Sequence, residues 1–206
     1  MTRLILIVGL LSMSLAAVAC GAGKEAGVVS SPTASAELTV VPSAPLAEPT
    51  IVGNEIVFPD KGYKALIPEG WTADANMLRQ GRVTYDGFVD PEKIQGVQPN
   101  ITVAREELQD KLDSSAYVDL KLKTISALVG ADVTVSGSVE VAGQQSSFVD
   151  YAHKVPVAFD KRDVIFVDND VGWTITLTTP GGQRDTFLPI LNDFLASFQL
   201  LGAGGS

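Results

Sequence analysis

The alternation of hydrophobic and polar positions near the C-terminus predicts a strand followed by a helix. Apolar residues alternate with threonines between Trp173 and Leu177, which is the period of a half-buried strand. The proline and glycines at residues 180–182 end this strand, because proline cannot donate to the ladder. We expect a helix to begin near Asp185 or Thr186. Its apolar stripe has the spacing of a helix packed on a sheet: Phe187, Leu188, Ile190, Leu191, Phe194, Leu195 and Phe198.

Shorter alternating segments predict further strands earlier in the chain. They are Ile56–Phe58, Tyr63–Ile67, Val83–Val89, Asn100–Arg105, Val133–Val141, Gln145–Val155 and Val164–Val167. The stripe over Ala116–Val129 predicts a helix that Ser114 or Ser115 caps and that Gly130 ends. Phe159–Asp163 is expected to be a charged loop. The pattern therefore predicts a single α+β domain with an antiparallel β-sheet of about six to seven strands.

The N-terminus has the pattern of a signal peptide over residues 1–19. A positive residue precedes the short apolar stretch Leu4–Leu15, and small residues then lead to Cys20, the only cysteine. A lone cysteine in this place resembles the bacterial lipobox, in which the cysteine is lipidated, although Ala17 stands where leucine is usual. We predict acylation of Cys20 and an extracytoplasmic location in the bacterial cell envelope, lipid-anchored to the membrane. The alternatives are an ordinary secretory signal cut near Ala19 and an uncleaved anchor.

The segment after the signal, residues 20–51, predicts a disordered tether. It is rich in Ala, Ser, Pro, Thr and Val and contains no aromatic residue. A flexible chain of about thirty residues would hold the domain on the order of 30 Å from the membrane. The alternative is that the segment packs on the domain. We assign residues 52–201 to the folded domain and residues 202–206 to a disordered tail.

The charge of the chain limits the partners that it can have. The formal net charge is −9, of which residues 1–19 carry +1 and residues 20–51 carry −2, so the remainder carries −8. Nucleic acids and anionic lipid surfaces both require a basic face, so we expect neither as a direct partner of the domain. An acidic surface favours solubility or a basic protein partner.

The stretch KGYKALIPEGW, residues 61–71, predicts a strand that ends in a Pro-x-Gly turn before a tryptophan. We expect the ring of Trp71 to plug one end of the core, and the alternative is a binding platform. Tyr63, Trp71 and His153 together form the candidate binding surface.

His153 is the only histidine, and the sequence gives it no catalytic partners. On its strand it shares a face with Tyr151, whereas Asp150 points to the other face, which is poor geometry for an Asp–His pair. No nucleophile motif such as G-x-S-x-G occurs. We therefore predict that the protein is not an enzyme.

Asp168 and Asp170 are weak candidates for metal ligands. With the asparagine between them they place several oxygens close together, which suits a hard cation. The spacing of a calcium-binding EF-hand is absent, and Asp and Asn before a glycine are also typical of a hairpin turn. A turn is the preferred interpretation, and no metal or other cofactor is predicted.

Three stretches carry a resemblance to a known family. They are YKALIPEGW at residues 63–71, VSGSVEVAGQQ at residues 135–145, and the closing strand and helix at residues 171–200. The chain resembles the PsbP-like superfamily, which includes the DcrB-type and LpqN-type bacterial lipoproteins. The resemblance implies an antiparallel sheet sandwiched by helices, and an accessory, binding or assembly role without a shared catalytic mechanism. PsbP carries an N-terminal docking segment that nothing here matches, so a photosynthetic role is not implied.

Two functional hypotheses follow from the sequence. The first is a non-catalytic, membrane-anchored lipoprotein whose domain binds a protein or another envelope component in an accessory or assembly role. The alternative is a carrier that holds a lipid or small hydrophobic molecule in a cavity between sheet and helix, motivated by the many large apolar side chains near the C-terminus. A continuous apolar cavity would favour the carrier.

Overall fold

A computed structural model describes residues 47–80, 82–154 and 157–202 of the chain, without the side chains of residues 75–80. The chain divides into the units Met1–Pro42 and Ser43–Ser206, and all of the described residues belong to the second unit. The elements are β1 (Thr50–Val52), β2 (Glu55–Phe58), the 3-10 turn η1 (Pro59–Lys61), β3 (Tyr63–Leu66), β4 (Thr72–Gln80), β5 (Val83–Val89), β6 (Asn100–Glu107), α1 (Ser114–Val129), β7 (Gly137–Val141), β8 (Gln144–His153), β9 (Phe159–Asp168), β10 (Val171–Pro180), α2 (Arg184–Ser197) and β11 (Gln199–Leu200).

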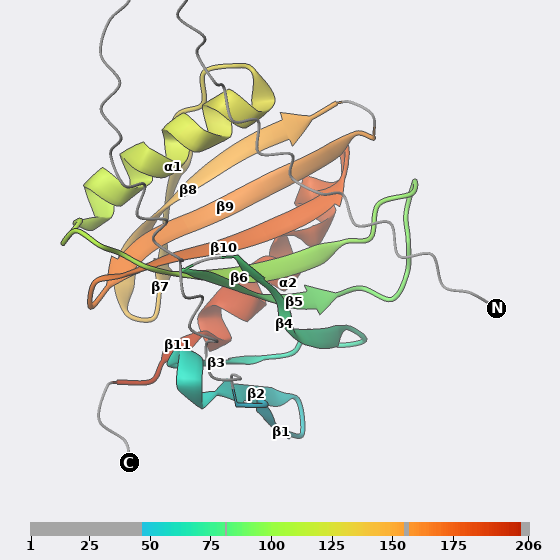
Figure 1. The fold of residues 1–206 in the computed structure, drawn as a ribbon. Helices are drawn as coiled ribbons and strands as arrows, with labels where there is room; N and C mark the ends of the chain where they lie inside the picture. The colour runs from blue at the N-terminus through green and yellow to red at the C-terminus, as the bar shows by residue number, and fades with distance from the viewer. Residues whose placement is uncertain (1–46, 81, 155–156, 203–206) are drawn as a thin grey trace, which may run out of the picture. The chain divides into compact units, whose positions relative to one another are not determined.

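Within these described residues the strands form one seven-stranded and one four-stranded antiparallel sheet. The large sheet has the order β4-β5-β6-β10-β9-β8-β7, and the small sheet has the order β1-β2-β3-β11. Helix α1 lies on one face of the large sheet, and α2 lies on the opposite face together with the small sheet (Figure 1). The predicted α+β fold, an antiparallel sheet sandwiched by helices, is confirmed.

Successive side chains of each strand point to opposite faces of the large sheet, so one set faces α1 and the other faces α2. On β10, Trp173, Ile175 and Leu177 join the core under α2, and the intervening threonines face the side of α1. The main core also contains a cluster of aromatic rings from the small sheet, the large sheet and the C-terminal segment: Phe58, Tyr63, Phe88, Phe166, Trp173, Phe187, Phe194 and Phe198. A smaller core lies under α1 around Tyr117, Ile125 and Val149.

The tight turns explain why neighbouring strands pair in these registers. Between β9 and β10, Asn169 and Asp170 both have positive φ, at 48° and 62°, which is the geometry of a type I′ hairpin turn. Ala142 and Gly143 make a similar turn between β7 and β8. The predicted pairing of the Trp173 strand with the strand before it is confirmed by the Trp173–Phe166 register.

Helix α1 begins earlier than predicted and has a different cap. Asp113 is the N-cap, and its side chain accepts a hydrogen bond of 2.8 Å from the backbone N–H of Ala116. The Ser114 hydroxyl instead accepts from the backbone N–H of Val167, so it connects the helix to β9. The C-terminal cap at Gly130, with φ of 68°, is confirmed.

The expectation of a charged loop at Phe159–Asp163 is wrong, because these residues form the first half of β9. Two of their charged side chains, Asp160 and Arg162, have hydrogen-bond partners in other parts of the domain. Arg162 pairs across the strands with Asp150, and Asp160 accepts a hydrogen bond from the backbone N–H of Gly182. The strand predicted from Val133 begins only at Gly137.

Candidate functional site

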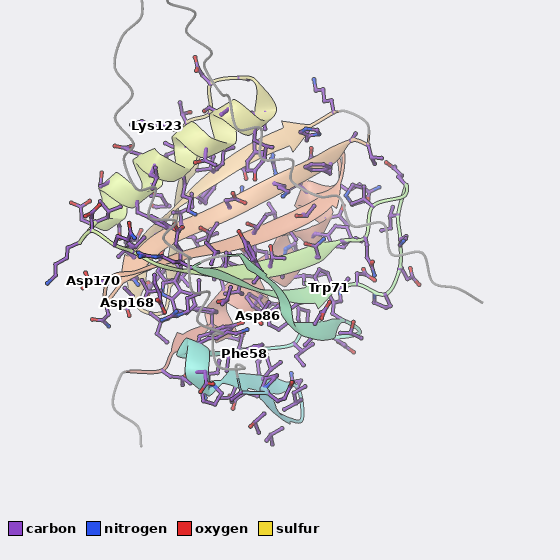
Figure 2. All side chains as sticks on the ribbon, viewed as in Figure 1. Phe58, Trp71, Asp86, Lys123, Asp168 and Asp170 are labelled. Atoms are coloured by element: carbon purple, nitrogen blue, oxygen red, sulfur yellow. The ribbon has the colours of Figure 1, made fainter. Side chains whose placement is uncertain are left out.

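The candidate binding surface of Tyr63, Trp71 and His153 is not brought together by the fold. Tyr63 is fully buried and stacks between Phe58 and Phe198, at ring separations of 4.6 and 5.1 Å. Trp71 is also buried, 6.5 Å from the ring of Phe187. Both rings are part of the core, so neither can offer a surface, and the expectation that Trp71 plugs the core is correct. Figure 2 shows Phe58 and Trp71 where the large sheet meets the small one.

His153 lies at the end of β8 and is half-buried. Its imidazole stacks on Phe159 of the neighbouring strand at 4.9 Å. Tyr151 and Val149 share its face, as predicted, and the structure places both in the core under α1. Asp150 points to the opposite face, where it pairs with Arg162. The structure therefore gives His153 no acidic partner on its own strand, in agreement with the sequence pattern.

His153 lines a groove on the surface of the large sheet. The groove has a volume of about 640 Å³, within the range of about 300–1,000 Å³ that is usual for ligand pockets. One wall is the segment from the end of α1 to β7, with Val129, Val133 and Ser136. The other wall is β8 from Asp150 to the residue after its end, Lys154.

The β8 wall of this groove is an unpaired strand edge. On this side β8 pairs with β7 only from Gln144 to Phe148, whereas on its other side it pairs with β9 as far as His153. The backbone N–H of Asp150 donates to the Ser136 hydroxyl, which takes the place of a strand carbonyl. Beyond Asp150, no backbone hydrogen bond crosses from this edge to any residue of the described part of the chain.

Strand β7 begins at Gly137, opposite Phe148 of β8. Gly137 lies under the ring of Phe148, and a Cβ at Gly137 would lie 2.7 Å from the Phe148 ring. The ring covers the glycine, and the guanidinium of Arg162 lies 4.0 Å above the same ring. Before Gly137 the chain turns away toward α1, and this departure opens the groove.

The unpaired half of β8 is bound on its α2 side through the carboxylate of Asp150. Arg162 donates two hydrogen bonds of 2.7 Å each to the two carboxylate oxygens of Asp150. Arg184, at the start of α2, lies 3.7 Å from the same carboxylate. These contacts fix the strand from the α2 side, so its edge is presented to the groove in an extended conformation.

A network of polar side chains joins the first half of α1 to the large sheet. The Tyr117 hydroxyl and the Lys121 ammonium both donate to Glu106 Oε2, at 3.0 and 2.8 Å. Burial alone would raise the pKa of Glu106, but the hydrogen bond and charge of Lys121, with the hydrogen bond from Tyr117, lower it below its ordinary value. Glu106 therefore remains ionised and anchors the helix.

Asp163 is a buried carboxyl group on the same face of the sheet. Tyr151 donates to its Oδ2 at 3.1 Å, and its Oδ1 has no hydrogen-bond partner among the described residues. Burial raises the pKa of Asp163 above its ordinary value, and the neighbouring Thr176 and Lys161 offset only part of this effect. Burial, followed by the charge of Asp163, also raises the pKa of Tyr151.

Replacement of Asp163 by Asn should stabilise the protein at neutral pH by about 1 kcal/mol, because the substitution removes a buried, incompletely bonded charge. The folded-state pKa of Asp163 lies above its unfolded-state value, so its ionisation opposes folding as the pH rises through that interval. The gain should therefore disappear in acid, below the ordinary carboxyl pKa of about 3.9. Urea unfolding of both proteins at neutral and acidic pH measures this difference, with exposed Asp119→Asn as the control. An equal gain at both pH values would contradict the explanation.

The weak metal candidates Asp168 and Asp170 belong to the β9–β10 turn, away from Trp71 (Figure 2). Asp168 accepts a hydrogen bond from Asn169, and the carbonyl of Asp170 accepts one from the backbone of Leu108. Among the described residues no group of three or more His, Cys, Asp or Glu side chains could hold a metal ion. The turn interpretation accounts for both residues.

The N-terminal predictions fall outside the structure. Cys20 and the predicted signal peptide lie outside the described residues, as does most of the predicted tether. No helix in the described ranges is long and apolar enough to cross a membrane.

The large apolar residues that motivated the carrier hypothesis pack against one another. Phe198 contacts the rings of Tyr63, Phe166 and Trp173, and Phe88 lies 4.7 Å from Phe194. The layer between the sheet and α2 is filled by these side chains. A second hollow, of about 450 Å³, lies beside α2 and is lined by polar residues such as Asp193 as well as apolar ones.

Comparison with solved structures identifies the fold. No family model and no curated protein sequence matches this chain. The solution structure of cyanobacterial PsbP (CyanoP) from Synechocystis sp. PCC 6803 has a TM-score of 0.51 and 16% sequence identity, and the match covers 73% of this chain and 97% of that chain. The Ran-binding protein Mog1p of Saccharomyces cerevisiae matches at a TM-score of 0.48 and 14% identity over 74% of this chain and 97% of its own. The chain has the PsbP-like fold, as its sequence motifs predict.

Proposed function

We propose that this chain uses its PsbP-like fold as a non-catalytic binding domain of a membrane-anchored lipoprotein, with a protein as its partner. The observation that carries the proposal is the groove along the unpaired edge of β8. An extended strand with free backbone groups, beside a wall of mixed apolar and polar side chains, is suited to the recognition of another polypeptide. The domain would act in an accessory or assembly role.

Features of the whole chain support an extracytoplasmic setting for this role. The apolar N-terminal stretch, the lone Cys20 after small residues and the Pro-rich segment that follows have the order of signal, lipid attachment and tether. The net charge of −9 favours a basic partner surface over nucleic acid. The domain would bind its partner at the distance from the membrane that the tether permits.

The proposed binding role is tested by crosslinking in native membranes. The tagged full-length chain serves as bait, and mass spectrometry identifies the proteins that crosslink to it. One reproducible protein partner, lost when residues of the groove are altered, supports the proposal. Recovery of a lipid or small molecule in place of a protein would contradict the proposal and support the alternative hypothesis that the domain is a carrier.

The lipid anchor makes a separate prediction. Inhibition of lipoprotein signal peptidase should leave a larger precursor in the membrane fraction, because cleavage before Cys20 depends on that enzyme. Cys20→Ser should have the same effect, and metabolic labelling with a fatty-acid analogue should mark the wild-type chain only. Unchanged processing under inhibition would show that Cys20 is not a lipoprotein cleavage site.

A further inference from the structure

We propose that the free edge of β8 binds an extended peptide segment of the partner protein, which adds to the large sheet as a new strand. This inference rests on the proposed binding function and names the way in which the groove recognises its partner. The occupant is a segment in extended conformation, and it lies beside Asp150–Lys154 on the line that β7 would follow if it continued. Strand addition of this kind is a general mode of peptide recognition.

The hydrogen-bonding groups on the edge define the chemistry of the occupant. In an antiparallel sheet alternate residues turn their N–H and C=O groups to the same side. Phe148 accepts from Ser136 on the β7 side, and Asp150 donates to Ser136 on that same side. It follows that Ala152 directs its N–H and C=O into the groove. A row of backbone donors and acceptors at strand spacing is complementary to another peptide backbone.

The walls of the groove indicate the side chains that the occupant carries. Val129, Val133 and Tyr151 give the α1 side of the groove an apolar surface. An added strand would point alternate side chains toward this surface, and β-branched apolar residues fit a strand of this kind. Asp132 is exposed on the loop wall and would attract a basic residue of the segment, whereas Lys154, just after the end of β8, would repel one at the other wall. The net negative charge of the chain adds to the attraction by Asp132.

Among the described residues, no proline and no covering loop lies along the edge of β8 from Asp150 to His153. Exposed strand edges are commonly blocked by proline, by charges that point inward or by a covering loop. In the described structure the only group that occupies the edge beyond Phe148 is the Ser136 hydroxyl, which takes a single N–H. The Arg162–Asp150 pair holds the strand straight from the opposite face. Within the described part of the chain, this edge is therefore extended and unpaired.

Ala152→Pro separates this mode from other ways of using the groove. Proline removes the Ala152 N–H, and this position can accept proline because the N–H faces the groove and makes no bond to β9. Ala152→Thr is the matched control, since it changes an exposed side chain and keeps the N–H. The probe is a phage-displayed library of random linear peptides, presented to the full-length chain in detergent.

We expect the wild-type chain and Ala152→Thr to enrich peptides with alternating β-branched residues and a basic residue, and Ala152→Pro to enrich none above background. In wild type, an enriched synthetic peptide should slow hydrogen exchange at the Ala152 amide by at least about tenfold. This measurement uses the wild-type chain alone, so it does not require that any variant folds. Enrichment that persists in Ala152→Pro, no enrichment by wild type, or unchanged exchange at Ala152 would each overturn the inference.

Two further results distinguish the inference from its alternatives. In the first, a crosslinked protein partner binds the Ala152→Pro variant as tightly as it binds wild type. That result would support the proposed binding function and would rule out strand addition at β8 as the mode of binding. Protection of the Ala152 amide in the chain alone, lost when residues 21–46 are deleted, would show that the occupant is a segment of this chain, and would overturn the assignment to a partner.

Discussion

Replacement of Lys61 by Met should lower the free energy of unfolding by about 3–5 kcal/mol, which is a large part of the stability of an ordinary domain. Lys61 is an ion pair partner of Asp86, and the two side chains are only 3% and 1% exposed. The Tyr63 hydroxyl donates to the other oxygen of Asp86 at 2.8 Å, and the Lys61 ammonium lies 5.0 Å from the centre of the Phe58 ring. Without the lysine, a carboxylate remains in the core next to aromatic rings.

The pair connects the small sheet to the large one, because Lys61 ends η1 and Asp86 lies in β5 (Figure 2). Chemical denaturation of the purified protein measures the loss. Lys64→Met is the matched control, since Lys64 forms a partly exposed pair with Glu55 that should contribute less than about 1 kcal/mol. The double change Lys61→Met with Asp86→Leu should recover part of the loss, because the buried carboxylate is then removed together with the ammonium group. A Lys61→Met protein as stable as Lys64→Met would contradict this account.

The second large effect concerns Gly172, at which we expect alanine to cost about 1–3 kcal/mol. A Cβ at Gly172 would lie 2.3 Å from the Cζ atom of Tyr117, which is closer than atoms can approach. The Tyr117 ring is 1% exposed and packs α1 directly on β10. The added methyl group would push the helix away and lengthen the hydrogen bond from Tyr117 to Glu106.

Thermal unfolding and the near-ultraviolet circular dichroism of tyrosine measure this change. Gly202→Ala serves as the control, because nothing lies within 4 Å of a Cβ at that exposed position. If the clash with the ring is the cause, the cost of Gly172→Ala should fall when Tyr117 is first replaced by Leu. A cost that is the same in both backgrounds would assign the effect to the strand backbone.

The sequence predicts the closing strand and helix well because their apolar residues follow a clear period, as between Trp173 and Leu177. It also predicts the turn at Asn169, because Asn and Asp tolerate positive φ. It fails at Phe159–Asp163, where Arg162 pairs with Asp150 of β8 and Asp160 accepts from Gly182 in the turn before α2, partners that are distant in the sequence. The N-cap at Asp113 was missed because neighbouring serines give the same signal.

The groove could not have been predicted from sequence. It exists because β7 is shorter than β8 and pairs with only the first half of that strand, and the lengths of two paired strands are not encoded in either segment alone. His153 was identified as a candidate for its rarity, and it does line the groove. Tyr63 and Trp71 were selected as aromatic residues near a turn, but the sequence pattern does not say which side of the chain the core will cover.

The place of β10 in the large sheet has a consequence for how the chain acquires its structure. This strand comes late in the sequence, yet it lies between β6 and β9, so the two halves of the sheet have no shared partner until it arrives. Helix α2, which covers the main core, comes later still. Because most of the native contacts join distant parts of the sequence, assembly is slow compared with that of helical bundles. Any machinery that handles the protein from its N-terminus, such as a ribosome or a secretion channel, therefore meets a polypeptide that has not yet folded.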